Sequence, residues 1–145
     1  MKIALASDHA AYDMKEKIKE FLNSREIEWE DFGTFSNDSV DYPDFAIPAA
    51  ESVAGNYSDI GIIICGTGIG MSIAANKVKG VRAALCCTED TAILSRQHNN
   101  ANVLCFGART NSWENAQIMI TAFLTTEFEG DRHIRRLDKI QSYEC

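Results

Sequence analysis

The sequence predicts an α/β fold in which helices cover both faces of a parallel β-sheet. Short runs rich in Ile, Val and Ala recur along the 145 residues and end at Gly, Asp or Thr, as buried parallel strands do. Segments in which apolar residues have helical spacing separate these runs. Strand and helix alternate five times, and each parallel crossover needs a helix.

The elements can be assigned in chain order. Strands are expected at residues 2–6, 27–32, 60–65, 81–87 and 101–106. The helices between them are marked by apolar residues one turn apart or adjacent, such as Met14 with Ile18, Phe45 with Ala49, Ile69 with Ile73, Ala92 with Ile93, and Ile120 with Phe123. A last helix is expected from Asp131 to about Gln141, with Asp131 as its cap and an apolar stripe of Ile134, Leu137 and Ile140. The expectation is a single three-layer α/β/α, Rossmann-like domain over residues 1–145, with a five-stranded parallel sheet and a C-terminal helix.

Composition excludes several classes of protein. The net charge of −7 argues against nucleic acid as a partner. The start, MKIALASDHA, contains an apolar run too short for a secretion signal or a membrane span. The five cysteines show neither C-x-x-C nor paired histidine spacing, so no disulfide framework or zinc site is expected. We expect a cytoplasmic protein without a membrane partner.

The most informative segment follows the third strand and reads Cys65-Gly66-Thr67-Gly68-Ile69-Gly70. Its glycines let backbone amides approach a ligand closely, and the helix expected to begin near Met71 adds its positive end. A dinucleotide fingerprint would need Gly at position 71, and a P-loop would need Gly-Lys-Ser or Gly-Lys-Thr. A thiolate phosphatase loop would need Arg at position 71. We therefore expect an anion-binding turn with a thiol at its edge.

Cys65 is a candidate base. A thiol at a strand end beside a helix N-terminus has its thiolate stabilised by the dipole and by amide donors. The alternative is a buried structural cysteine, the commonest state of a free cysteine, and position alone does not decide between them. For Cys86, Cys87 and Cys105, placed within strands, we expect only the structural role.

Other candidate residues also have two readings. His98, at the end of the fourth helix, can shuttle a proton near pH 7 or merely complement the helix dipole. His9, after the first strand, can donate to a phosphate or merely end that strand. Arg132 and Arg136, one helical turn apart, can grip a phosphate dianion or form a solvated basic face. Tyr42 lies in a turn and fits a ligand contact or packing.

Taken together, these segments resemble one family of enzymes. The matching segments are Ser7-Asp8-His9-Ala10, Val40 to Asp44, Cys65 to Gly70, His98-Asn99, Gly107-Ala108-Arg109, and Arg132-His133 with Arg136. In this order they resemble ribose-5-phosphate isomerase type B, within a broader group that includes allose-6-phosphate and galactose-6-phosphate isomerases. The resemblance extends over essentially the whole chain.

The resemblance implies interconversion of ribose 5-phosphate and ribulose 5-phosphate through an enediolate, without metal or organic cofactor. Cys65 would take the proton from the carbon next to the carbonyl. Some relatives use a carboxylate at position 71 instead, where this chain has Met71. Thr67 and His98 would assist, the first at the developing oxyanion and the second in ring opening. The oxyanion would be held by the amides of Gly66, Gly68, Ile69 and Gly70.

The resemblance also implies substrate contacts and an assembly. Asp8 and Asn99 would hold sugar hydroxyls, and Tyr42 would be a further sugar contact. The phosphate would be held by His9, Arg109, Arg132 and Arg136. The family is at least dimeric, which implies a homodimer or a dimer of dimers, with His98, Asn99 and Arg109 reaching the neighbouring subunit's site.

Other functions stay open at this point. An isomerase of a six-carbon sugar phosphate would share the base and the phosphate grip. A phosphate-binding module without catalysis would need only the glycine turn and the arginines. A thiol redox role for Cys86 and Cys87 lacks a resolving partner at useful spacing.

Overall fold

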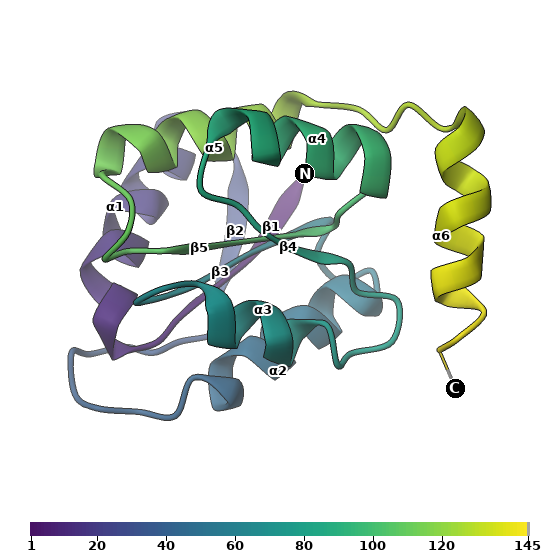
Figure 1. The fold of residues 1–145 in the computed structure, drawn as a ribbon. Coiled ribbons are helices and arrows are strands. Elements are labelled where there is room, and N and C mark those ends of the chain that lie inside the picture. Colours follow the sequence, from purple (N-terminus) through teal and green to yellow (C-terminus); the bar gives the residue numbers. More distant parts are fainter. Residues whose placement is uncertain (145) are drawn as a thin grey trace.

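The computed structural model describes residues 1–144 and confirms the layered α/β architecture, with helices on both sides of a central sheet (Figure 1). The strands are β1 (Lys2–Ser7), β2 (Glu28–Asp31), β3 (Ile60–Cys65), β4 (Ala83–Leu85) and β5 (Val103–Gly107). The α-helices are α1 (Tyr12–Asn23), α2 (Pro43–Ala54), α3 (Ile69–Ala75), α4 (Glu89–Asn99), α5 (Trp113–Thr125) and α6 (Ile134–Gln141), and two single 3-10 turns are η1 (His9–Ala11) and η2 (Asp131–His133). Across residues 1–144, no helix combines the length and apolar character that crossing a membrane requires. Cys145 lies outside the described residues.

All strands are parallel, and their order in the sheet is β2-β1-β3-β5-β4. From β1 the chain moves outward to β2, and it then crosses back to place β3 on the other side of β1. The direction of winding therefore reverses between β1 and β3. In open parallel sheets, ligands bind beyond the carboxyl ends of the strands at such a reversal. The residues after Ser7 and after Cys65 meet there.

The sheet separates two apolar layers. Ile62 and Ile64 point toward the layer that contains α1, α4 and α5. Ile63 and Cys65 point toward the layer of α2 and α3. This alternation along β3 follows from the period of two in a strand, and both faces are apolar because both are covered. Cys65 thus lies at the end of a buried strand, under α2 and α3.

β1, β2 and β5 differ from the expected bounds by one or two residues, and three further differences have a local cause. β4 covers only Ala83–Leu85, and Cys87 is exposed rather than a buried strand residue. The amide of Cys87 donates to Oγ1 of Thr91 (3.3 Å), so Cys87 already belongs to the capping turn of α4. α3 begins at Ile69 rather than near Met71. Asp131 does not cap the last helix, because it lies inside η2 with a φ of 45° and α6 begins only at Ile134. Neither η2 nor α6 has a side-chain cap.

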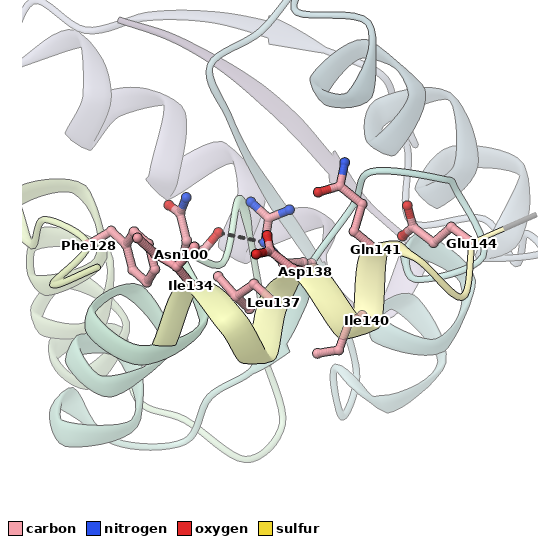
Figure 2. A pocket seen from close by; sticks show the side chains of 9 residues that line it. Asn100, Phe128, Ile134, Leu137, Asp138, Ile140, Gln141 and Glu144 are labelled. Carbon is pink, nitrogen blue, oxygen red and sulfur yellow. Dashed lines mark hydrogen bonds between the residues drawn. The ribbon is translucent and has the colours of Figure 1, made fainter. Parts of the chain in front are cut away.

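α6 stands apart from the sheet, beyond the amino ends of the strands (Figure 1). None of its residues is buried, and Ile134 and Ile140 are 49% and 54% exposed. The expected stripe of Ile134, Leu137 and Ile140 borders a groove of about 190 Å³ that also contains Phe128 (Figure 2). Exposed apolar side chains gathered on one helix face mark a surface that can be covered by another chain.

Candidate active site

A small cavity lies at the carboxyl ends of β1 and β3. Its volume is about 250 Å³, and it is lined by Asp8, His9, Ala10, Tyr42, Cys65, Gly66, Thr67, Gly70 and Arg109. A larger hollow of about 540 Å³ lies against α1, α4 and α5, but its lining contains no thiol or imidazole. We place the candidate site in the smaller cavity, because reactive side chains converge there at the reversal of the sheet.

Cys65 lies in the wall of this cavity, with 5% of the residue exposed. The amide of Gly68 donates a hydrogen bond to its Sγ over 3.1 Å. Gly68 has a φ of +79°, and a Cβ there would lie 2.6 Å from the backbone carbonyl carbon of Phe106. Only glycine fits this position without strain. The turn therefore aims a backbone donor at the sulfur, which stabilises negative charge on it.

Two further glycines let long side chains reach the cavity. A Cβ at Gly66 would lie 3.2 Å from Nη1 of Arg109, so the guanidinium passes directly over this residue. A Cβ at Gly70 would lie 2.7 Å from Cζ of Tyr42, so the phenol ring packs on bare backbone. Arg109 thus lines the cavity beside Cys65 of its own chain, and the expectation that it reaches a neighbouring subunit's site is corrected.

Asp8 and His9 come from the turn after β1. The amide of Val40 donates to Nδ1 of His9 over 3.2 Å, so in the neutral ring Nδ1 accepts and Nε2 carries the proton. Asp8 is 8% exposed, and its Oδ1 accepts from the amide of Ala11 over 3.2 Å, which caps η1. The turn therefore supplies the cavity with an imidazole N–H donor and a carboxylate acceptor.

Other sequence-predicted site residues are not in this cavity. Gly68 belongs to the turn but does not line the cavity. Ile69, which is 52% exposed, does not line it either. Four more lie at the other end of the molecule: His98, Asn99, Arg132 and Arg136. α4 starts after the carboxyl end of β4 and runs back for 11 residues. That is a rise of about 16 Å, so its last turn reaches the amino ends of the strands, near α6 (Figure 1).

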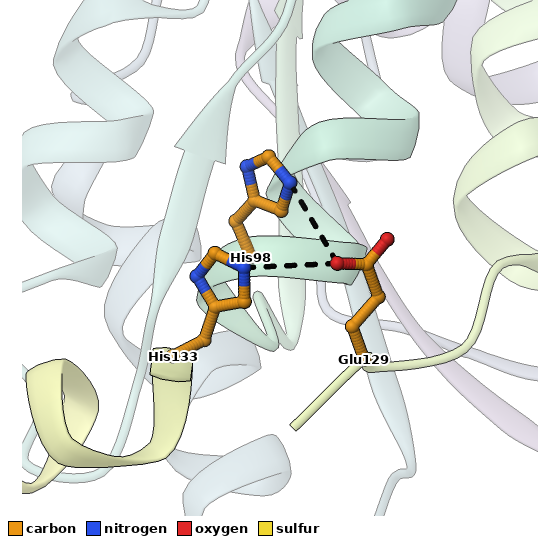
Figure 3. Close-up of side chains that lie close together, drawn as sticks. All are labelled: His98, Glu129 and His133. Carbon is orange, nitrogen blue, oxygen red and sulfur yellow. Dashed lines mark ion pairs between the residues drawn. The ribbon is translucent and has the colours of Figure 1, made fainter. Parts of the chain in front are cut away.

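At that end, His98 belongs to a second cluster. Its ring stacks on that of His133, with centroids 4.4 Å apart and planes 13° from parallel. Oε2 of Glu129 lies 3.6 Å from Nε2 of His133 and 3.9 Å from Nε2 of His98 (Figure 3). Burial, followed by the neighbouring His98, Arg132 and Arg136, lowers the pKa of His133, while Glu129 opposes the shift. Within residues 1–144, His98, Glu129 and His133 are the group whose donor atoms lie close enough together to hold a metal ion.

Comparison with known proteins identifies the family. The sequence model of the Ribose/Galactose Isomerase family matches residues 3–140. The chain belongs to this family. Ribose-5-phosphate isomerase B of Escherichia coli is 46% identical over 143 residues, covering 99% of this chain and 96% of that protein. The resemblance inferred from the motifs is thereby confirmed.

Solved structures of ribose-5-phosphate isomerase B agree with the fold. That of Clostridium thermocellum superposes with a TM-score of 0.98 at 49% identity, covering 99% of this chain and 97% of that one. That of Mycoplasma genitalium, with bound ribulose-5-phosphate, has a TM-score of 0.95 at 48% identity, covering 99% of this chain and 95% of that one. The Rossmann-like α/β fold of this ribose/galactose isomerase family member is confirmed.

The sequence patterns did not predict one buried ion pair, between Lys15 and Asp31. Nζ of Lys15, which is fully buried, donates to Oδ1 of Asp31 and to the carbonyl oxygen of Thr34, both over 2.5 Å. Burial lowers the pKa of Lys15, although the carboxylate opposes this. A signal was present in the spacing, because Lys15 lies three residues before the buried Ile18 and four after the buried Ala11. The bond to Thr34 anchors the start of the segment that runs on to Val40, whose amide donates to His9.

Two other cysteines, expected to be buried, are buried in the structure. Cys86 and Cys105 are buried in the sheet region. Burial raises the pKa of both thiols. Neither lines the cavity that contains Cys65.

Proposed function

We propose that this chain interconverts ribose 5-phosphate and ribulose 5-phosphate in the cytoplasm, with Cys65 as the base. The observation that carries the proposal is the position of Cys65 in the wall of a polar cavity, with the Gly68 amide on its sulfur. The family and the ribulose-5-phosphate bound to the Mycoplasma genitalium relative support the choice of substrate.

In the proposed reaction, the Cys65 thiolate removes the proton from the second carbon of the open-chain aldose. The carbonyl oxygen at the first carbon becomes the enediolate oxygen, which Thr67 and the amides of Gly66 and Gly70, the turn residues that line the cavity, stabilise. The resulting thiol returns the proton to the first carbon, while the hydroxyl proton moves from the second oxygen to the first. The product is a ketose, the thiolate is regenerated, and no electrons leave the sugar.

The remaining cavity residues bind the substrate in this proposal. The Nε2–H of His9 and the guanidinium of Arg109 donate to the phosphate. Asp8 accepts from sugar hydroxyls, and the hydroxyl of Tyr42 adds a further contact. Each of these side chains lines the same cavity as Cys65.

A second copy of the chain completes the site. His98 ends α4 at the opposite edge of the sheet from Cys65 of the same chain, so we assign His98 and Asn99 to a neighbour's substrate (Figure 1). We assign ring opening to His98 and a sugar contact to Asn99 of that neighbour. Arg132 and Arg136, at the same end of the molecule, would add to the phosphate grip. The exposed apolar face of α6 supports a homodimer, or a dimer of dimers, as the functional form.

The test is incubation with ribose 5-phosphate, allose 6-phosphate and galactose 6-phosphate in deuterated water. We expect ketose formation with ribose 5-phosphate, and deuterium exchange at the second carbon. Faster turnover of a six-carbon phosphate would reassign the substrate. Tight binding of all three sugars without ketose or exchange would instead indicate a phosphate-binding module.

A further inference from the structure

We propose that His98, Glu129 and His133 form a binding site for a late first-row divalent metal ion, with zinc as the expected ion, and that metal bound there inhibits the isomerase. The binding part rests on the geometry of these three residues. The inhibition part rests on the proposed function, because it assumes that His98 opens the sugar ring.

The backbone holds the three side chains together. The amide of Glu129 donates to the carbonyl oxygen of Gln97 over 3.1 Å, which ties the segment after α5 to the last turn of α4. Gly130, with a φ of 73°, then turns the chain into η2. His133 follows four residues after Glu129 and is only 6% exposed. The donor atoms are therefore brought together by chain geometry rather than by flexible surface side chains alone.

The distances are close to those of a metal site. The carboxylate oxygen lies 3.6 and 3.9 Å from the two Nε2 atoms, and all donor atoms lie within 4.8 Å of one another. In tetrahedral zinc sites the bonds are about 2.0 to 2.2 Å, which separates neighbouring ligand atoms by about 3.3 to 3.6 Å. Figure 3 shows both Nε2 atoms directed toward the same carboxylate oxygen. Small rotations of the side chains would complete the site.

The donor set selects the type of metal. Two imidazoles and one carboxylate suit zinc, cobalt, nickel or copper better than magnesium or calcium, which prefer oxygen ligands. Three protein ligands leave a fourth position for water, as in catalytic zinc sites.

Nearby arginines limit the affinity. Nε of Arg132 donates weakly to Nε2 of His133 over 3.4 Å, and Arg136 also repels positive charge from this ring. Arg132 is exposed, so its side chain can turn into solvent when a metal enters. Arg132→Ala should therefore tighten metal binding, which distinguishes this site from one elsewhere on the chain.

The binding test is a titration of the full chain with Co²⁺, followed by visible absorption. We expect ligand-field bands without a thiolate charge-transfer band, and loss of the bands when Zn²⁺ is added. His98→Asn, Glu129→Gln and His133→Asn should each weaken binding by about tenfold or more. The matched controls are His9→Asn, the remaining histidine, and Glu127→Gln, an exposed acid two residues from Glu129. Both should bind cobalt like the unaltered chain.

Two results would overturn the binding site. One is a thiolate band that disappears in Cys65→Ala or Cys87→Ala. The other is unchanged affinity in Glu129→Gln, an exposed substitution that should leave folding intact, confirmed by circular dichroism.

Inhibition is measured as the zinc concentration that halves each variant's own metal-free rate. This concentration should rise about tenfold or more in Glu129→Gln. Cobalt binding without inhibition would reject the inhibitory role alone. A chain with no isomerase activity would reject the proposed function, while the cobalt spectrum would still test the site.

Discussion

The thiol of Cys65 is the one group in the cavity that we assign to carbon deprotonation. Cys65→Ser should lower kcat by about 10² to 10⁴-fold, because an alcohol is a far weaker acid and its alkoxide is scarcely present at neutral pH. Binding of ribulose 5-phosphate should change little, since the phosphate contacts remain. Steady-state kinetics and calorimetry check the two parts separately. Turnover equal to that of the unaltered chain would remove Cys65 from the mechanism.

Gly70 is expected to act through Tyr42. An added methyl group would lie 2.7 Å from Cζ of the phenol and must displace the ring. Gly70→Ala should therefore raise KM by about twofold to tenfold, the loss of one hydrogen bond. The control is the same substitution in a Tyr42→Ala background, where it should have little further effect. Additive losses in that double-mutant cycle would show that Gly70 acts independently of Tyr42.

Among the secondary-structure elements, those with long apolar runs were predictable and those fixed by single hydrogen bonds were not. β3 has six buried residues, and its observed bounds match the prediction. β4 is shorter than predicted because Arg82 is held by the side chain of Asn102 (2.7 Å) and Cys87 joins the cap of α4. The early start of α3 has a similar local origin in the Gly68 turn. Local polar contacts of this kind leave little trace in hydrophobic periodicity.

The buried Lys15 on α1 should contribute more to the free energy of unfolding than an exposed lysine does. Lys15→Met would leave Asp31, whose side chain is only 10% exposed, with less compensation from its partners. We expect a loss of about 3 kcal/mol in the free energy of unfolding. The matched control is Lys2→Met, which breaks an exposed pair with Glu30 and should change stability little. Equal effects in urea denaturation would show that the buried pair is not special.

The Asp31 carboxylate of this pair should make the stability of the fold depend on pH in the acid range. Burial alone would raise the pKa of Asp31, but hydrogen bonds from Lys15, Lys19 and the Gly33 amide lower it below 3.8. The stability that this carboxylate contributes is therefore fully present above that value and is lost as the pH falls through the lowered pKa. The stability difference between the unaltered chain and Asp31→Asn should shrink as the pH falls below about 4. A difference that is constant from pH 7 to pH 2.5 would exclude this linkage.

The candidate site residues lie at two ends of the whole molecule, and only the family resemblance implied that His98 and Asn99 serve a neighbouring subunit's site. Asp8, Cys65 and Arg109 lie at or just after the carboxyl ends of strands, so their convergence was expected from the parallel sheet. His98 ends a crossover helix, and such a helix returns the chain to the amino edge of the sheet. That consequence was available from the sequence once the fold was assigned. Strand order was not available, because β1, β3 and β5 have similar apolar runs and local patterning does not specify which neighbours pair.

This separation makes a sharp prediction for mixed assemblies. In a symmetric dimer whose sites each use Cys65 of one copy and His98 of the other, Cys65→Ala and His98→Asn chains are each inactive. A mixed dimer has one site with both defects and one site with neither. Random mixing makes half of the dimers mixed, so about a quarter of all sites and of the original turnover should return. The measurement is activity after the two purified variants are dissociated together and reassembled, with each variant reassembled alone as the control. If mixed dimers form, as detected by differently tagged chains, and activity stays at the level of the controls, then His98 does not serve the neighbour's cavity.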